Sequence, residues 1–148
     1  MIGAMHGPHS RMLSRRASVI AAVVVLAVAG SLAGSAAESA DKTIRLTVDY
    51  GDGVSKTIDH LAWAKGYTVL DAMKEATARP HGISFSFTGS GGSAMLTKID
   101  DVANEGGGAG KKDWHYLVNG AYGDRSFATF ALQAHDDVVW RFTTAQGQ

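Results

Sequence analysis

The chain has 148 residues, which is room for one domain with a targeting segment. Its 14 basic residues balance 14 acidic ones, so no excess of positive charge predicts binding to nucleic acid or to an anionic membrane. The absence of cysteine excludes a disulfide framework, a thiolate metal site and a thiol nucleophile.

The N-terminal segment, residues 1–37, is typical of a secretory signal peptide. Before Glu38 every charged residue is an arginine, and an apolar run at 19–29 precedes a stretch of mostly small residues at 30–37. The apolar run would rise about 16 Å as a helix, too short to cross ~30 Å of hydrocarbon. We therefore predict cleavage after Ala37 and export by the general secretory or the twin-arginine route. The alternative is an uncleaved membrane anchor.

A hairpin is predicted next. Residues 43–50 alternate apolar and polar side chains with the period of two that a half-buried strand shows. A Gly-Asp-Gly turn signal occupies 51–53, and residues 54–61 are expected to form the second strand. We assign residues 38–42 to a short linker and residues 43–144 to a single domain.

One helix follows the hairpin. Thr68 is a good N-cap, and Asp71 stands three residues later, where it can complete a capping box. Apolar residues continue at spacings of three and four as far as Ala76, as on the buried face of a helix. Pro80 and Gly82 are expected to end it.

The second half of the domain is predicted to consist of strands. They are expected at 83–88, 94–102, 114–120 and 136–142, with a flexible glycine-rich loop at 105–112. The strand at 114–120 ends in Asn-Gly, a strong hairpin-turn signal. One helix on one face of a single mixed β-sheet, after an initial hairpin, is an α+β arrangement of the β-grasp type.

Catalytic and metal-binding motifs are missing from the sequence. Gly110 and Lys111 match only part of a phosphate-binding loop, and no serine lies in a Gly-x-Ser-x-Gly elbow. The histidines after residue 37 lack the close spacing of helical metal ligands. We predict that the domain is not an enzyme, requires no cofactor and has no metal site.

The aromatic residues leave two interpretations open. Trp114 and Tyr116 share one face of their strand, and His115 lies on the other. These rings, with Tyr122 and Phe127, either fill the core under the helix or partly crown an exposed edge. Exposed rings there would stack on a planar ligand or anchor a protein partner.

Four segments occur in a familiar order and spacing. They are Thr-Val-Leu-Asp-Ala-Met at 68–73, Ile-Asp-Asp at 99–101, Trp-His-Tyr-Leu-Val-Asn-Gly at 114–120, and the segment 136–140. Together they resemble a bacterial family of exported domains of unknown function, related to the C-terminal domain of transcobalamin and intrinsic factor. Asp101 and His135 stand where that family usually has glycine, so the two turns are expected to be shaped differently.

The resemblance implies a β-grasp domain that binds a ligand without catalytic residues, with a corrinoid such as cobalamin as the best single ligand. It assigns the ligand-facing positions to Trp114, Tyr116, Asn119 and Gly120, and the aromatic pattern adds Tyr122. In the vertebrate carriers a larger helical domain holds the other face of the corrinoid, and no counterpart is expected here. The alternative function is an exported protein–protein adaptor that pairs through a sheet edge or an aromatic patch.

Overall fold

The computed structural model describes residues 42–144, so the predicted signal peptide lies outside the described residues. In chain order its elements are β1 (Thr43–Asp49), β2 (Ser55–Ala62), α2 (Val69–Ala78), β3 (Phe85–Thr88), the 3-10 turn η1 (Gly91–Ser93), β4 (Met95–Ile99), β5 (Val102–Ala103), β6 (Lys112–Val118), β7 (Ala121–Tyr122) and β8 (Asp137–Thr144). Within this range no helix is long and apolar enough to cross a membrane.

Strands β1 and β2 form the predicted antiparallel hairpin. The carboxylates of Asp49 and Asp52 each accept a hydrogen bond from a backbone N–H two residues later, at Gly51 and Val54. These side chains hold the tight turn locally, which is why the Gly-Asp-Gly signal could be recognised without knowledge of the fold.

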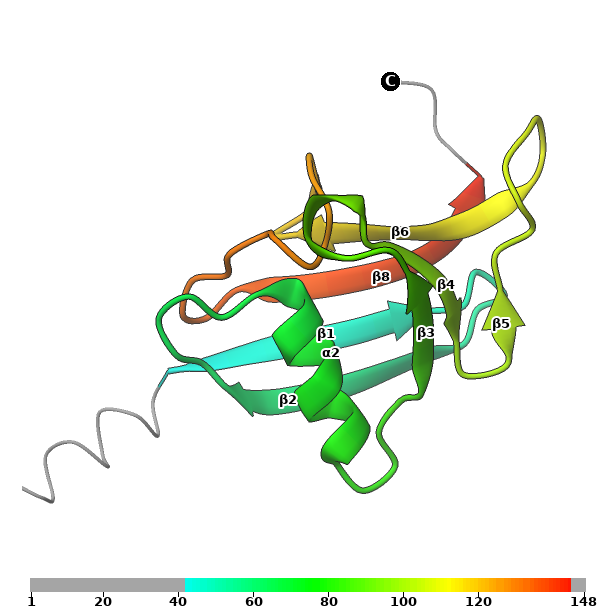
Figure 1. The fold of residues 1–148 in the computed structure, drawn as a ribbon. Coiled ribbons are helices and arrows are strands. Elements are labelled where there is room, and N and C mark those ends of the chain that lie inside the picture. Colours follow the sequence, from blue (N-terminus) through cyan, green and yellow to red (C-terminus); the bar gives the residue numbers. More distant parts are fainter. Residues whose placement is uncertain (1–41, 145–148) are drawn as a thin grey trace, which may run out of the picture.

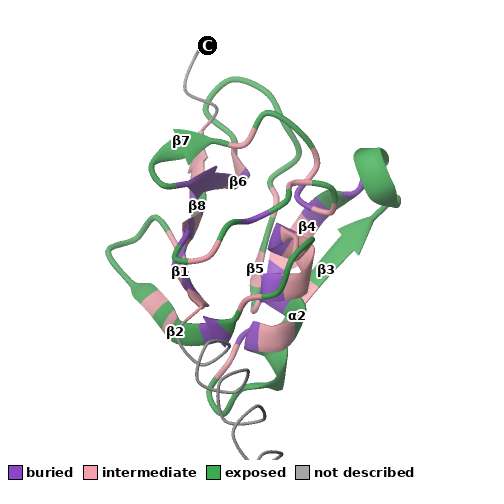
Figure 2. Ribbon diagram, turned by 90° about the vertical axis from the view of Figure 1, so that its left-hand side faces the viewer, coloured by how far each residue is buried: buried purple, intermediate pink, exposed green. Residues whose placement is uncertain are grey.

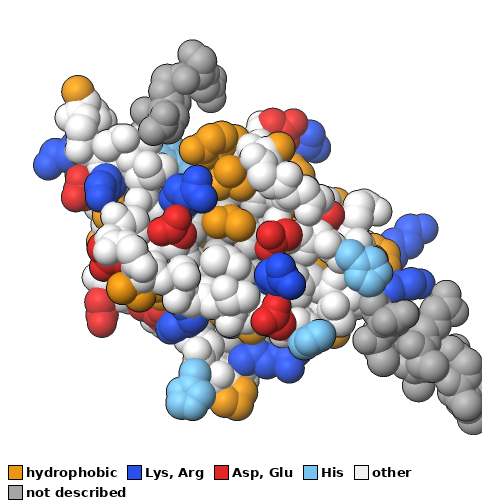
Figure 3. Space-filling view, turned by 180° about the vertical axis from the view of Figure 1, so that it is seen from behind, with side chains coloured by type: hydrophobic (Ala, Val, Ile, Leu, Met, Phe, Trp, Pro, Cys, Tyr) orange, Lys and Arg blue, Asp and Glu red, His pale blue; other side chains and the backbone are white. Residues whose placement is uncertain are grey.

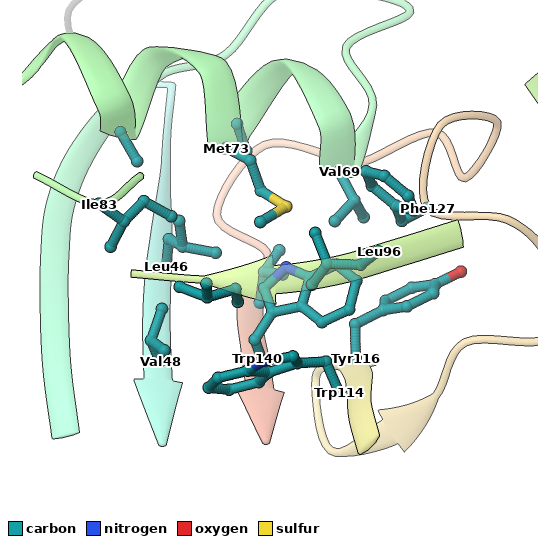
Figure 4. Packing of buried hydrophobic residues seen from close by; sticks show 14 of the residues in the cluster. Leu46, Val48, Val69, Met73, Ile83, Leu96, Trp114, Tyr116, Phe127 and Trp140 are labelled. Atoms are coloured by element: carbon teal, nitrogen blue, oxygen red, sulfur yellow. The ribbon is translucent and has the colours of Figure 1, made fainter. Parts of the chain in front are cut away.

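Helix α2 begins and ends as its sequence predicts. The Thr68 side chain accepts a hydrogen bond from the Asp71 N–H, and the Asp71 carboxylate accepts one from the Thr68 N–H, which completes the capping box. The helix ends at Ala78, before the proline. Figure 4 shows Val69 and Met73 pointing from α2 into the core, toward Trp140 of β8.

The strands form two sheets. Five strands make a mixed sheet in the order β2-β1-β8-β6-β7, in which β1 and β8 are parallel and the other neighbours are antiparallel. Strands β3, β4 and β5 make a separate antiparallel sheet. In Figures 1 and 2 the five-stranded sheet forms one layer, and α2 with β3 and β4 forms the other.

The predicted α+β class, with a helix on one face of a mixed sheet, is confirmed for residues 42–144. The prediction that all strands join that one sheet is wrong. Strands β3 and β4 pair with each other, and the buried side chains of Leu96 and Ile99 in β4 join the core cluster to which α2 also contributes. The second sheet therefore takes part in covering the large sheet, which a single helix of ten residues leaves partly uncovered.

Side-chain alternation on the two strands with the most aromatic residues is confirmed. Trp114 and Tyr116 of β6 and Trp140 of β8 face the core and are 2–8% exposed. Their rings pack closely, with centroids of Tyr116 and Trp140 5.3 Å apart. Phe127 is also buried, whereas Tyr122 is 50% exposed. Of the four rings considered from the sequence, three are therefore core residues and one lies at the surface.

Candidate functional site

A cleft of about 300 Å³ separates the edge of β4 from the edge of β6, where the two sheets part. Its lining residues come from β4 and the residue before it, the residue after β5, β6, β7 with the segment that follows it, and one position of β8. They are Ala94, Met95, Leu96, Asn104, Asp113, Trp114, His115, Tyr116, Tyr122, Gly123, Arg125, Ser126, Phe127 and Trp140. Four consecutive residues of β6 line it, although alternate side chains of a strand point to opposite faces. The cleft is therefore bordered by the backbone edge of β6 as well as by side chains.

The side chain of Asn104 closes one end of the cleft. Its Nδ2 donates to the carbonyl oxygen of Leu96 in β4 at 2.8 Å, and its Oδ1 accepts from the N–H of Trp114 in β6 at 2.9 Å. A primary amide offers both N–H donors and a carbonyl acceptor, so it can bond to two backbones as a peptide group does. Asn104 thus joins the two sheets where a backbone strand would otherwise join them.

The segment after β7 closes the other end. Ser126 Oγ donates to the carbonyl oxygen of Ala94 at 2.9 Å, and the Gly123 N–H donates to the carbonyl oxygen of Tyr116 at 3.0 Å. Gly123 lies against the Tyr116 ring so closely that a methyl group on its Cα would overlap the ring. This position therefore requires glycine for close approach.

The wall of the cleft is aromatic and rigid. Tyr116 donates its hydroxyl to the carbonyl oxygen of Arg125 at 2.7 Å. Burial raises the pKa of the Tyr116 hydroxyl to about 12, so it stays protonated as a donor at neutral pH. The Trp114 indole N–H donates to the carbonyl oxygen of Val102 at 2.9 Å. Both rings are therefore held by the protein itself.

Two exposed side chains form the rim. Met95 of β4 is 63% exposed and Tyr122 of β7 is 50% exposed, and both line the cleft. The Tyr122 ring meets the His115 ring edge to face, with centroids 6.3 Å apart. These exposed apolar groups offer contact area that nothing in the described range covers.

The structure brings together three of the five residues assigned to a ligand site from the sequence. Trp114, Tyr116 and Tyr122 line the cleft, but Asn119 and Gly120 do not. The latter two form the β6–β7 turn with φ of +51° and +83°, which is the geometry an Asn-Gly hairpin turn adopts.

Asn119 also has a structural role outside the cleft. Its Nδ2 donates to a carboxylate oxygen of Asp136 at 2.8 Å, and its Oδ1 accepts from the Asp137 N–H at 2.9 Å. Both polar atoms of its amide are thus used in tying the β6–β7 turn to the start of β8.

Sequence reasoning missed the residues that close the cleft and one side of its rim. Asn104, Ser126 and Met95 belong to no motif, and each acts across a gap between segments that are distant along the chain. Only the position of Asn104, between a predicted strand and the glycine-rich loop, was a usable signal, because polar residues at strand ends often bond to neighbouring backbone.

Charged groups around the cleft are already paired. The Asp113 carboxylate accepts hydrogen bonds from the N–H groups of Gly106 and Gly107, both at 3.1 Å. Arg125 forms an ion pair with Asp124 at 2.8 Å. Within residues 42–144 no three histidine or acidic side chains converge in a way that could hold a metal ion.

The outer face of the five-stranded sheet carries a second hollow of about 500 Å³. Figure 3 shows acidic and basic side chains interspersed on this side of the molecule. Arg141 and Asp49, which line the hollow, form an ion pair at 3.0 Å, and no residue assigned from the sequence contributes to it. The cleft between β4 and β6 is therefore the candidate site.

Comparison with known proteins adds a family and a fold. A family model described as "Domain of unknown function (DUF4430)" matches residues 66–144. Among solved structures, a "putative metal binding protein" from Ruminococcus gnavus is similar, with a TM-score of 0.56 and 13% sequence identity. The match covers 71% of this chain and 99% of that one, and at this identity it indicates a shared fold. No curated protein matches the chain.

Proposed function

We propose that this chain, which belongs to the DUF4430 family of domains of unknown function, is a binding domain whose ligand occupies the cleft between β4 and β6. The observation that carries the proposal is the convergence of Trp114, Tyr116 and Tyr122 on one cleft. Ligand sites in proteins are concave, largely apolar and supplied with a few oriented polar groups, which is how this cleft is built.

The strand order supports the β-grasp assignment and with it the relation to the transcobalamin C-terminal domain. An initial hairpin is followed by a helix, and the last strand, β8, lies parallel to β1 in the centre of the sheet. These are the features that the β-grasp arrangement requires. We propose that the three-stranded sheet is an addition to it.

We propose that the domain is not an enzyme. The polar groups of Asn104, Ser126 and the Tyr116 hydroxyl are engaged in bonds that hold the cleft together. A nucleophile needs a base within hydrogen-bond reach, and none of these three groups is hydrogen bonded to a histidine or a carboxylate. This arrangement favours binding over bond cleavage.

A corrinoid is the ligand that the family resemblance suggests, and we propose it as the first ligand to test. A planar macrocycle would lie across the rim made by Met95 and Tyr122, because the aromatic wall behind them is packed into the core. Contact with an exposed ring and a flexible thioether suits a flat apolar surface.

Equilibrium dialysis against cobalamin and its nucleotide-free analogue tests this ligand. We expect saturable retention at micromolar concentration, which corresponds to about −8 kcal/mol of binding free energy. The Tyr122→Ser substitution should weaken retention about tenfold because it removes one exposed ring from the rim. Val54→Ser, at a residue 58% exposed in the β1–β2 turn, is the matched control and should change nothing. Absence of retention at millimolar corrinoid would exclude this ligand.

We propose that the domain is exported and that residues 1–37 are removed. The basic, apolar and small-residue order of that segment supports this. The N-terminal residue of the protein recovered from outside the cytoplasm should be Glu38. An intact N-terminus on membrane-bound protein would instead indicate a retained anchor, the only case in which we expect a membrane partner.

A protein partner is the second candidate, and one observation favours it. Within residues 42–144, strand β7 pairs with only Leu117 and Val118 of β6, so no strand covers the β6 edge between Asn104 and Gly123. Open edges of this kind accept extended segments of other chains.

A further inference from the structure

On the side of β6 that faces the cleft, only some of the backbone N–H and C=O groups form hydrogen bonds. The Trp114 N–H is bonded to Asn104 and the Tyr116 carbonyl oxygen to the Gly123 N–H, so both point away from β8 and toward the cleft. In a strand the N–H and C=O of one residue point to the same side. The Trp114 C=O and the Tyr116 N–H therefore also face the cleft.

These two groups are free in the described part of the chain. Among the loop, cap and side-chain hydrogen bonds of residues 42–144, none is formed by the Trp114 carbonyl oxygen or the Tyr116 N–H, and both groups point away from the ladder with β8. They flank His115, whose own backbone points to the other side and lies opposite Arg141 of β8. Buried backbone donors and acceptors in proteins are nearly always paired, so an adjacent unbonded pair beside a cleft suits a ligand that supplies both partners.

We propose that the cleft binds a peptide segment, one residue of which enters between Asn104 and Gly123 and pairs with the Trp114 C=O and the Tyr116 N–H as a one-residue addition to the sheet. This rests on the proposed function, namely that the cleft is the binding site. A residue lying beside His115 in parallel orientation donates its N–H to Trp114 and accepts from Tyr116 at its C=O. An antiparallel segment would need residues directly opposite Trp114 and Tyr116, where Asn104 and Gly123 already bond to β6.

Electrostatic complementarity favours a peptide backbone over a planar macrocycle. The edge offers one partly negative oxygen and one partly positive N–H at the spacing of a strand, and peptide backbone repeats both groups at that spacing. Asn104 already makes this kind of contact at one end of the cleft, with a side-chain amide in place of a peptide group. A corrin ring presents no such repeat.

The surroundings define which peptide fits. Of the two charged side chains that line the cleft, Arg125 is ion-paired with Asp124 and the Asp113 carboxylate is held by the N–H groups of Gly106 and Gly107, so both are already bonded within the protein. The exposed Met95 and Tyr122 offer apolar contact on either side. We therefore expect a neutral segment with an apolar side chain next to the bonded residue.

Amide hydrogen exchange of the ¹⁵N-labelled full chain tests the premise and the proposal together. In the free protein the Tyr116 N–H should exchange at least ~100-fold faster than the Leu117 N–H, which faces β8. The probe is the tightest binder from a random heptapeptide display library, made with capped ends. At saturation this peptide should slow exchange at Tyr116 at least ~10-fold.

Two controls separate backbone pairing from side-chain contact. N-methylation of the peptide at each amide in turn keeps every side chain but removes one donor, and methylation of the edge-facing amide should abolish binding. The Tyr122→Ser substitution should weaken binding of the peptide, whereas Val54→Ser should leave the affinity for the peptide unchanged.

The outcomes distinguish the peptide from the proposed function. Protection of the Tyr116 N–H in the free protein, equal binding of every N-methylated peptide, or failure to select any peptide that protects Tyr116 would each overturn the peptide proposal. Tyr122-dependent retention of a corrinoid, together with failure of every peptide to protect Tyr116, would overturn the peptide proposal and leave the cleft as the binding site. If the Tyr122→Ser substitution changes the binding of neither the corrinoid nor the peptide, both proposals fail.

Discussion

The Trp114→Ala variant is expected to lose about 3–5 kcal/mol of unfolding free energy, as truncations of buried aromatic residues do. The indole is 6% exposed and meets Tyr50 and Phe142 with ring centroids 5.8 and 5.2 Å apart. Its N–H bonds to the Val102 carbonyl, so truncation also leaves that oxygen without its partner. A loss of this size is a large fraction of the stability of a single domain.

Urea denaturation followed by far-ultraviolet circular dichroism measures the effect. Tyr122→Ala is the matched control, because it removes an exposed ring from the same cleft and should shift stability by less than about 0.5 kcal/mol. A Trp114→Ala protein that unfolds cooperatively at the wild-type urea concentration but no longer binds ligand would contradict this expectation. It would mean that the Trp114 ring acts mainly on the ligand.

The Asp100→Asn variant is expected to lose about 1.5–3 kcal/mol at neutral pH, the usual contribution of hydrogen bonds to a charged group. One carboxylate oxygen of Asp100 accepts from the Ser84 N–H at 2.8 Å. The other accepts from the Tyr50 hydroxyl and from Lys56 Nζ. This group therefore ties the β1–β2 hairpin to the second sheet. Asparagine is chosen because position 100 has a φ of +47°, which asparagine tolerates.

The loss should depend on pH in a defined direction. Burial raises the pKa of the Asp100 carboxyl, but the bonds from Ser84, Tyr50 and Lys56 outweigh it, so the pKa lies below the usual value of 3.8. A lowered folded-state pKa contributes stability above the unfolded-state pKa of about 4, and that contribution disappears as the pH falls through the lower folded-state value. Wild type and Asp100→Asn should therefore differ most near neutral pH and converge in acid below about pH 4.

Denaturation curves at several pH values check this expectation. Asp101→Asn changes the exposed neighbouring carboxylate and should stay within about 0.5 kcal/mol of wild type throughout. A difference between Asp100→Asn and wild type that is constant down to pH 2 would show that the charge of Asp100 is not what stabilises the contact.

Turns show where local rules succeed and where the tertiary placement of a residue differs from its assignment. Asn119 and Gly120 were recognised as a turn, and they are one, but they were also assigned to the ligand site and do not line the cleft. At the turn that contains Asp101, the left-handed backbone belongs to Asp100, with a φ of +47°, and not to Asp101. At His135 the backbone is left-handed with a φ of +70°, as a glycine-preferring position requires.

Elements whose causes lie within a few residues could be predicted from the amino-acid order alone. The hairpin of β1 and β2, the capped helix α2 and the alternation along β6 and β8 each follow from side chains close together in the chain. Hydrogen bonds of caps and turns, and the period of side chains on a strand, act at that range. The α+β class follows from the same patterns.

The location and openness of the candidate site depend on contacts between distant segments. Strands β3 and β4 pair with each other and leave the edge of β6 partly without a neighbour. Whether Trp114 is core and Tyr122 is surface depends on which of them the second layer covers. Alternation specifies that two faces of a strand differ, but which edge stays open is a consequence of how the layers pack, and only the tertiary structure decides that.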